Sequence, residues 1–345
     1  MFGGCHTALI TPMREDGSID YAGLEKLIEF QLANRIRGIL AVGTTGESPT
    51  LLWEEHNEVV ERTCKQAKGR ALTIAGTGSN STRETLAGTE HAAHVGAEVA
   101  LLVDPYYNGP SSLEIRREYV EPVAREFPQM QLIPYIIPGR SGTMMHPEDL
   151  AILAGQYPNV SAVKEATGSL ENMAKTRRLC GEQFAILSGD DDKTVEMMKH
   201  PQVRACGVIS VASNVIPGPT QRLTELLTAG ELAAADQLAT ALQPIFGIIT
   251  VLTTEQSPRG PVQCKARNPL AIKTLMNLLG MPAGPCRRPL GKMTRTGIEV
   301  VLRAARKTHQ LDPSALEPVA RFFGVDIEVR LNDLRLLEKL TYAAY

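Results

Sequence analysis

Eight short runs of apolar and β-branched residues recur along the first 211 positions of the chain, and each is followed by a helix-like segment. The spacing of Leu24, Leu27, Ile28 and Leu32 shows the amphipathic period of the first such segment. Strand-like runs that alternate with helices are typical of a parallel α/β fold. The runs cover residues 6–13, 38–43, 71–76, 99–104, 131–137, 160–164, 185–188 and 207–211.

Eight strand–helix units in this length predict one closed (β/α)₈ TIM barrel. A doubly wound sheet is the alternative, but it would need a glycine-rich phosphate turn after its first strand. Here the first run contains Thr11 and Pro12 and no G-x-G-x-x-G follows it. We therefore expect a catalytic barrel over residues 1–225, an added helical region over 226–311 and an extra helical extension over 312–345, with helices near 315–323 and 333–343.

Composition excludes several classes of protein. The chain has 345 residues, of which 43% are hydrophobic and 21% charged, and its net charge is -2. Without a basic excess, nothing recruits nucleic acid or an anionic membrane surface. The six cysteines show no regular spacing, and no apolar run reaches the length of a membrane helix. The first residues lack the pattern of a basic region followed by an apolar run, so we do not expect secretion. We expect reduced thiols and a cytoplasmic protein.

Catalytic groups of such barrels lie at the carboxyl ends of the strands, and the sixth run ends in Lys164. Lysine is rarely buried without a partner or a function. Desolvation lowers the pKa of an ammonium group, so that a neutral amine becomes available to attack a carbonyl and form a Schiff base. The alternative is a lysine that extends to solvent and pairs with Glu165 or Asp190.

Other strand ends carry polar residues whose function is open. The turn 43–48 contains Thr44 and Thr45 and could hold a carboxylate, or it could be a tight turn with a helix cap. Tyr107 follows the fourth run and Tyr135 lies near the end of the fifth, where aromatic packing is the alternative to a catalytic role. The three aspartates at 190–192 are interpreted as a solvated acidic turn, and we expect no metal.

Six motifs at these strand ends together resemble the dihydrodipicolinate synthase and N-acetylneuraminate lyase superfamily of class I aldolases. The resemblance covers about residues 2–311. The motifs are the turn 43–48, residues 105–108, Tyr135 with Pro138 and Arg140, and the segments 163–168, 188–191 and 207–210, with Asn268, Pro269 and Lys273 in the helical region.

The resemblance implies a role for each matching residue. Lys164 would condense with pyruvate without a cofactor, and the resulting enamine would attack an aldehyde. Tyr135 would be the general acid and base, with Thr44 and Tyr107 completing a proton relay and Tyr107 reaching in from a neighbouring subunit of a dimer or a dimer of dimers. The remaining pocket residues would be Thr45 on the pyruvate carboxylate, with Gly189 and Ile209 lining the site.

Arg140 favours the synthase branch of the superfamily, because a guanidinium suits the carboxylate of aspartate semialdehyde. The resemblance therefore implies condensation of pyruvate with that aldehyde in lysine biosynthesis. It also implies a feedback site for lysine at a dimer interface, formed by Ser48, His56, Asn80, Glu84 and Tyr106.

Two departures from the family pattern concern the aldehyde. Ile136 stands where the family usually has asparagine, and Gly139 where synthases often have serine. They leave two other functions open. One is an aldolase for 2-keto-3-deoxy sugar acids, or a lyase like N-acetylneuraminate lyase, that uses the same lysine. The other is a non-catalytic barrel that senses a keto acid.

Overall fold

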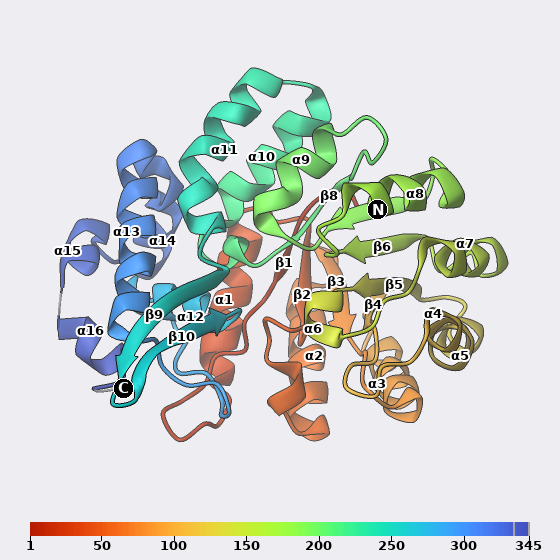
Figure 1. The fold of residues 1–345 in the computed structure, drawn as a ribbon, viewed down its shortest axis with the longest axis horizontal. Helices are drawn as coiled ribbons and strands as arrows, with labels where there is room; N and C mark the ends of the chain where they lie inside the picture. Colours follow the sequence, from red (N-terminus) through yellow and green to blue (C-terminus); the bar gives the residue numbers. More distant parts are fainter. Residues whose placement is uncertain (334, 344–345) are drawn as a thin grey trace. The chain divides into compact units, whose positions relative to one another are not determined.

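The computed structural model describes residues 1–333 and 335–343. Its central feature is a closed barrel of eight strands in sequence order, so the predicted fold is confirmed (Figure 1). The recorded ladders between β2 and β8 are all parallel. The strands are β1 (Gly4–Ala8), β2 (Gly38–Ala41), β3 (Leu72–Gly76), β4 (Val99–Val103), β5 (Gln131–Ile136), β6 (Ala162–Glu165), β7 (Ala185–Ser188) and β8 (Gly207–Ser210).

The first strand closes the barrel on both sides. The Gly4 N–H donates to the Cys206 carbonyl at 3.1 Å, beside β8, and the Arg37 N–H donates to the Cys5 carbonyl at 3.0 Å, beside β2. A Cβ atom at Gly207 would lie 2.0 Å from the Gly4 oxygen. Only glycine therefore allows the two backbones to approach this closely.

The prediction of a first strand over residues 6–13 is wrong in its second half. Residues 5–13 are all buried, but the strand ends at Ala8. Beyond it, the Ile10 N–H donates to Asn214 Oδ1 at 3.0 Å and the Met13 N–H donates to the Ala283 carbonyl at 3.1 Å. An apolar run marks burial, whereas a strand also requires a neighbouring ladder, and here the backbone finds other partners.

The chain forms two compact units. The first comprises Met1–His6, Arg37–Gly43 and Leu52–Ser210 and holds most of the barrel sheet. Its helices are α2 (Trp53–Ala67), α3 (Thr82–His94), α4 (Ser112–Glu114), the π-helix η2 (Ile115–Val120), α5 (Glu121–Glu126), α6 (Pro138–Ser141), α7 (Pro147–Gln156), α8 (Leu170–Cys180), the 3₁₀ turn η3 (Asp191–Lys193) and α9 (Thr194–Lys199).

The second unit comprises Thr7–Ile36, Thr44–Leu51 and Val211–Tyr345. Its elements are α1 (Tyr21–Ala33), η1 (Ser48–Thr50), η4 (Ala212–Asn214), α10 (Pro217–Ala229), α11 (Leu232–Phe246), β9 (Thr250–Ser257), β10 (Gly260–Arg267), α12 (Leu270–Leu278), α13 (Arg295–Leu311), η5 (Pro313–Ala315), α14 (Glu317–Phe323), α15 (Ile327–Asn332) and α16 (Arg335–Leu340). The units follow contacts rather than sequence, so the boundaries at 225 and 311 stay a prediction. No helix within the described residues has the length and apolarity needed to cross a membrane.

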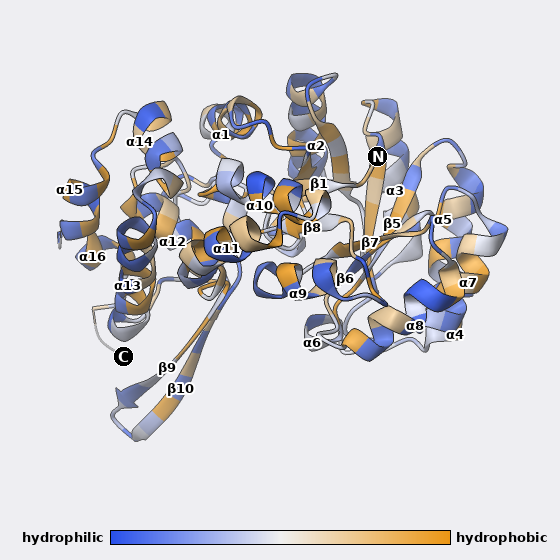
Figure 2. Cartoon of the chain, turned by 90° about the horizontal axis from the view of Figure 1, so that it is seen from above, coloured by the Kyte–Doolittle hydropathy of each residue, from blue (hydrophilic) through white to orange (hydrophobic). Residues whose placement is uncertain are grey.

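The expectation of a helical region over residues 226–311 is wrong for the segment 250–267. It forms an antiparallel hairpin, β9 and β10, whose register pairs Thr253 with Cys264. Figure 2 shows this ribbon extending away from helices α11 to α13. In β9, exposed side chains such as Leu252 alternate with buried or partly buried ones, which is the period of a strand.

The extension after residue 311 packs on the first helix of the same unit. The Phe30 ring of α1 is fully buried and lies 5.4 Å from the Phe322 ring and 5.1 Å from the Phe323 ring, both in α14. The predicted helix at 315–323 is confirmed as η5 and α14. Of the predicted helix 333–343, α16 covers Arg335–Leu340, and Leu334 lies outside the described residues.

The extension also caps helix α12. Arg330 Nε donates to the Leu278 carbonyl at 2.7 Å and its Nη2 donates to the Asn277 carbonyl at 2.6 Å. These carbonyls lie in the last turn of the helix, where the ladder of helical hydrogen bonds ends, and the Asn277 carbonyl also accepts from the Gly280 N–H at 3.1 Å. We expect Arg330→Ala to lower the free energy of unfolding by roughly 1.5–3 kcal/mol, since charged hydrogen bonds are lost.

Chemical denaturation measures this change. Arg335→Ala is the matched control, because that exposed arginine forms its hydrogen bonds within the described residues with the nearby Asp333. If both variants had the same stability, Arg330 would not be a structural cap.

Candidate active site

Lys164 and Tyr135 lie side by side on neighbouring strands of the barrel. The parallel register pairs Tyr135 of β5 with Lys164 of β6, near the carboxyl end of both strands. Lys164 is 4% exposed, and its Nζ lies 4.0 Å from the centre of the Tyr135 ring. The lysine is therefore buried, as predicted, and does not extend into solvent.

The electrostatic environment makes the Lys164 amine easier to deprotonate. Burial, as the largest cause, lowers its pKa from 10.5 to about 8, and the nearby Arg140 charge adds to this. The negative charges of Asp190 and Asp191 oppose the shift. At pH 7 about a tenth of such amines is neutral, compared with fewer than about one in a thousand for an ordinary lysine. The site therefore supplies a nucleophilic amine.

The sequence suggested that the acidic turn after β7 is solvated, but two of its three aspartates are buried or partly buried. Asp191 is 4% exposed and accepts a hydrogen bond from the Ser210 hydroxyl of β8. Burial and the charge of Asp192 raise the pKa of Asp190 to about 6, while Lys164 opposes the rise. Two of the three aspartates therefore act on the charge of the lysine, and only Asp192 is exposed.

We expect the pH dependence of amine reactivity to report this environment. Schiff-base formation needs the neutral amine, so its rate should rise with pH and level off above about 8. Asp190→Asn removes a charge that raises the pKa of Lys164. The midpoint of the curve of trapping rate against pH should therefore move to lower pH. The measurement is the rate of borohydride trapping of pyruvate between pH 6 and 10.

Asp192→Asn is the matched control, since Asp192 is exposed and is not among the charges that act on Lys164. An equal shift in both variants, or a shift to higher pH in Asp190→Asn, would contradict this picture of the site.

Gly189 brings the backbone after β7 against the lysine. A Cβ atom there would lie 2.8 Å from the Ala166 Cβ and 3.3 Å from the Lys164 Cε. The Gly189 N–H donates to the Glu165 carbonyl at 2.8 Å. A side chain at this position would press against Lys164. The lining of a substrate pocket by Gly189 stays a prediction.

Two buried carboxyl groups beside the lysine and the tyrosine were not predicted from the sequence. Glu165 follows Lys164, is 1% exposed, and accepts from the Thr167 N–H at 2.8 Å and from Asn172 at 3.3 Å. Asp104, whose N–H donates to the Tyr135 carbonyl at 3.1 Å, is fully buried, and burial raises its pKa to about 7. The sequence signal was an acidic residue at the end of the run 99–104 and another directly after the run 160–164.

The other predicted residues of this unit differ in exposure. Ile209 is fully buried in β8, whereas Arg140 in α6 is exposed and lies near enough to Lys164 to lower its pKa. Tyr107 is 95% exposed and has a φ of 80°. Such exposure leaves the tyrosine available to another subunit, but its role in a neighbouring site stays a prediction.

The turn that contains Thr44 and Thr45 belongs to the second compact unit. Thr45 is 2% exposed, and its hydroxyl accepts a hydrogen bond from Asn268 Nδ2 at 3.0 Å. The Gly46 carbonyl accepts from the Thr11 hydroxyl at 2.7 Å. The chain then turns through Glu47 in the left-handed region, with φ 60°, into η1. The turn is thus held by side chains from distant segments.

Four of the five residues predicted to bind lysine lie in the first unit. Glu84 accepts a hydrogen bond from the Ser79 hydroxyl. Burial of Tyr106 raises the pKa of its phenol, and the negative charge of Glu84 adds to this rise. His56 is buried with Nε2 2.9 Å from the Gly76 carbonyl, and burial lowers its pKa. Asn80 is exposed. Ser48 belongs to the second unit, in η1.

Comparison with known proteins decides the family. The model of the dihydrodipicolinate synthetase family matches residues 1–307. The chain belongs to this family. A 4-hydroxy-tetrahydrodipicolinate synthase of a Sulfurihydrogenibium species is 39% identical over 308 residues, which is 89% of this chain and 98% of the relative.

Solved structures of the family agree with the fold. The 4-hydroxy-tetrahydrodipicolinate synthase of Methylacidiphilum fumariolicum SolV is 34% identical with a TM-score of 0.82, covering 94% of this chain and 100% of that one. The dihydrodipicolinate synthase of Cyanidioschyzon merolae, solved with lysine bound, is 33% identical with a TM-score of 0.80, covering 89% and 98%.

Proposed function

We propose that this protein is a 4-hydroxy-tetrahydrodipicolinate synthase, a lyase of the class I aldolase type that condenses pyruvate with L-aspartate 4-semialdehyde at the start of lysine biosynthesis. The observation that carries the proposal is the buried Lys164, with a pKa lowered to about 8, beside Tyr135 in a member of this family. Relatives of that name, 36–39% identical over most of the chain, support the choice of reaction.

The lysine chemistry needs no cofactor. The neutral amine of Lys164 attacks C2 of pyruvate and gives a carbinolamine, which loses water to form a protonated Schiff base. Loss of a proton from C3 gives an enamine, and C3 then forms the new bond to the aldehyde carbon of the semialdehyde. The amino group of the semialdehyde then attacks C2 of the Schiff base, and the Lys164 amine leaves as the ring of the product closes. Each step requires a proton to be moved, which positioned hydroxyl groups accelerate.

We assign the proton transfers and contacts to residues that match the family motifs. Tyr135 is the general acid and base, and its position beside Lys164 supports this role. Thr44 and Tyr107 complete the relay, and Thr45 holds the pyruvate carboxylate. Arg140 suits the carboxylate of the semialdehyde, because a guanidinium binds carboxylates in a bidentate way. Gly189 and Ile209 line the pocket.

Assembly and regulation are parts of the same proposal. An exposed Tyr107 that serves a neighbouring site requires at least a dimer, and we propose a homodimer or a dimer of dimers in the cytoplasm. Inhibition by lysine at the site around Glu84 is supported by the lysine-bound relative. Loss of activity in Tyr107→Phe and lysine sensitivity that disappears in Glu84→Ala are the corresponding measurements.

The acceptor aldehyde is tested directly. The purified protein is incubated with pyruvate and aspartate semialdehyde, and product is followed with an NADPH-dependent reductase. We expect turnover that is lost in a Lys164 variant. Turnover only with hydroxylated aldehydes would instead indicate a sugar-acid aldolase, to which Ile136 and Gly139 would then be adapted. Pyruvate binding without turnover of either class would indicate a sensor.

A further inference from the structure

The turn that carries Thr44 and Thr45 is attached to helix α12 by a buried ion pair. Lys273 Nζ lies 2.7 Å from Glu47 Oε1, and both side chains are at most 1% exposed. Glu47 follows Thr45 by two positions, while Lys273 lies in the first turn of α12. All of these residues belong to the second compact unit.

Every donor and acceptor of the pair has a partner. The Lys273 ammonium also donates to the Thr11 carbonyl at 3.0 Å and to the Pro285 carbonyl at 2.7 Å. The second oxygen of Glu47 accepts from the Arg287 N–H at 2.7 Å. Burying an ion pair is costly unless its remaining hydrogen bonds are satisfied, as they are here. A pair of this kind holds a single geometry.

The segment that begins α12 also contacts Thr45 itself. Asn268 donates to the Thr45 hydroxyl at 3.0 Å. A hydroxyl that accepts this bond directs its own hydrogen elsewhere, where it can donate to another acceptor. The Thr45 hydroxyl can therefore donate its own hydrogen to a carboxylate while it accepts from Asn268.

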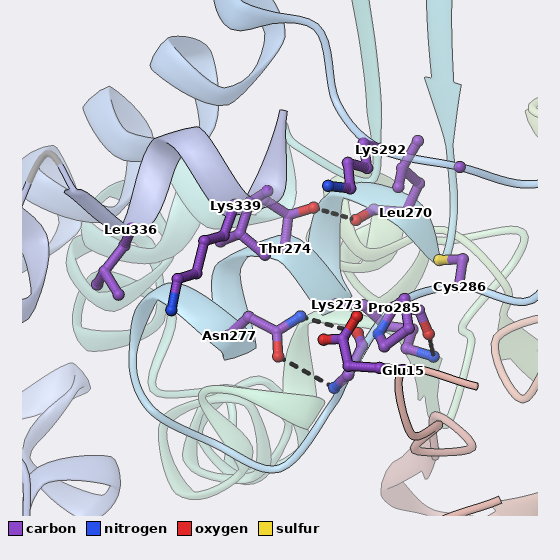
Figure 3. Close-up of a pocket in the computed structure, with 13 residues that line it drawn as sticks. Glu15, Leu270, Lys273, Thr274, Asn277, Pro285, Cys286, Lys292, Leu336 and Lys339 are labelled. Carbon is purple, nitrogen blue, oxygen red and sulfur yellow. Dashed lines mark hydrogen bonds between the residues drawn. The ribbon is translucent and has the colours of Figure 1, made fainter. Parts of the chain in front are cut away.

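Figure 3 shows Lys273 at the wall of a cavity of about 220 Å³, with Glu15, Pro285 and Lys292 also at its lining. The ammonium of Lys273 is engaged by its three acceptors, whereas Lys292 is exposed. Lys273 is thus held by the turn and its neighbours, whereas Lys292 lines the same cavity and, among the described residues, makes no hydrogen bond or ion pair with the turn.

We propose that Lys273 is a positioning residue: through its ion pair with Glu47, and together with Asn268, it fixes the Thr44–Thr45 turn and so sets the affinity for the carboxylate of pyruvate. The inference rests on the proposed function, because it assigns that carboxylate to Thr45. Lys273 does not touch the substrate, so its loss affects pyruvate binding more than the later steps.

The test compares Lys273→Met with Lys292→Met in the full-length enzyme. We expect Lys273→Met to raise the KM for pyruvate at least tenfold, with kcat and the KM for the aldehyde changed less than threefold. Lys292→Met should behave like the wild type. Equal losses in kcat and in both KM values would overturn the proposal, since they would indicate a general structural role.

A second variant separates positioning from folding, because Lys273→Met leaves a buried carboxylate unpaired and can destabilise the chain. Lys273→Met/Glu47→Leu removes both charges. We expect its melting temperature to recover while the KM for pyruvate stays raised. Recovery of the KM together with the melting temperature would overturn the proposal. If the single variant does not fold, this double variant alone decides.

A double-mutant cycle tests the contact with Thr45. Asn268→Ala should raise the KM for pyruvate about tenfold in the wild type and less than twofold in a Thr45→Val background. Equal effects in both backgrounds would show that Asn268 does not act through the hydroxyl. If the wild type forms no borohydride-stable adduct with pyruvate, the proposed function itself fails, which is a different outcome from any of these.

Discussion

Lys164→Met is expected to lower kcat by on the order of 10⁴-fold or more, because the variant loses the nucleophile that forms the Schiff base. Methionine keeps most of the apolar stem of the side chain and adds no charge to a buried site. The fold should therefore persist, with a melting temperature close to that of the wild type. The coupled assay measures kcat, and circular dichroism verifies the fold.

Lys175→Met is the matched control for this change. Lys175 lies on helix α8 and pairs with Glu148 at the surface, with a side chain that is 39% exposed. Its substitution should leave kcat unchanged. Residual turnover above about a hundredth of the wild-type rate in a folded Lys164→Met variant would mean that another group captures pyruvate.

Tyr135→Phe is expected to lower kcat by roughly 10²–10⁴-fold, the usual contribution of a positioned acid or base. Phenylalanine keeps the aromatic ring 4.0 Å from the lysine and removes only the hydroxyl. The loss should therefore lie in proton transfer. The pyruvate adduct should still form on Lys164, but more slowly, which rapid quenching with borohydride measures.

Tyr157→Phe removes a hydroxyl from a half-buried tyrosine that follows helix α7. It should leave both the rate of trapping and kcat unchanged. If Tyr135→Phe kept the wild-type kcat, the hydroxyl would have no part in the proton transfers, and a carboxyl group such as Glu165 or Asp104 would be the next candidate.

The strands and the buried lysine could be predicted because local sequence determines them. An apolar run that ends in a lysine predicts both a strand and a buried amine. Lys164 does lie in strand β6 and is buried. The pairing with Tyr135 follows from parallel register once the strands are in order. The hairpin 250–267 was missed, because an exposed ribbon lacks the apolar runs that mark a barrel strand.

Contacts between distant segments could not be predicted in the same way. Lys273 and Glu47 are separated by 226 positions, and nothing in the sequence around either residue shows that it is buried against the other. The lowered pKa of Lys164 also depends on burial by several strands and on the charges of Asp190 and Arg140. The spacing of motifs indicates which residues lie close together. The pKa of a buried group depends on its burial and on nearby charges, and these are known only once the chain is folded.

Trapping of pyruvate with borohydride tests the central claim most directly. The wild-type protein is incubated with pyruvate, reduced, digested and analysed by mass spectrometry. The account predicts one reduced pyruvate adduct for each chain, located on Lys164 and absent from Lys164→Met. An adduct on another lysine, or no adduct while turnover with aspartate semialdehyde continues, would contradict a Schiff-base mechanism at this site.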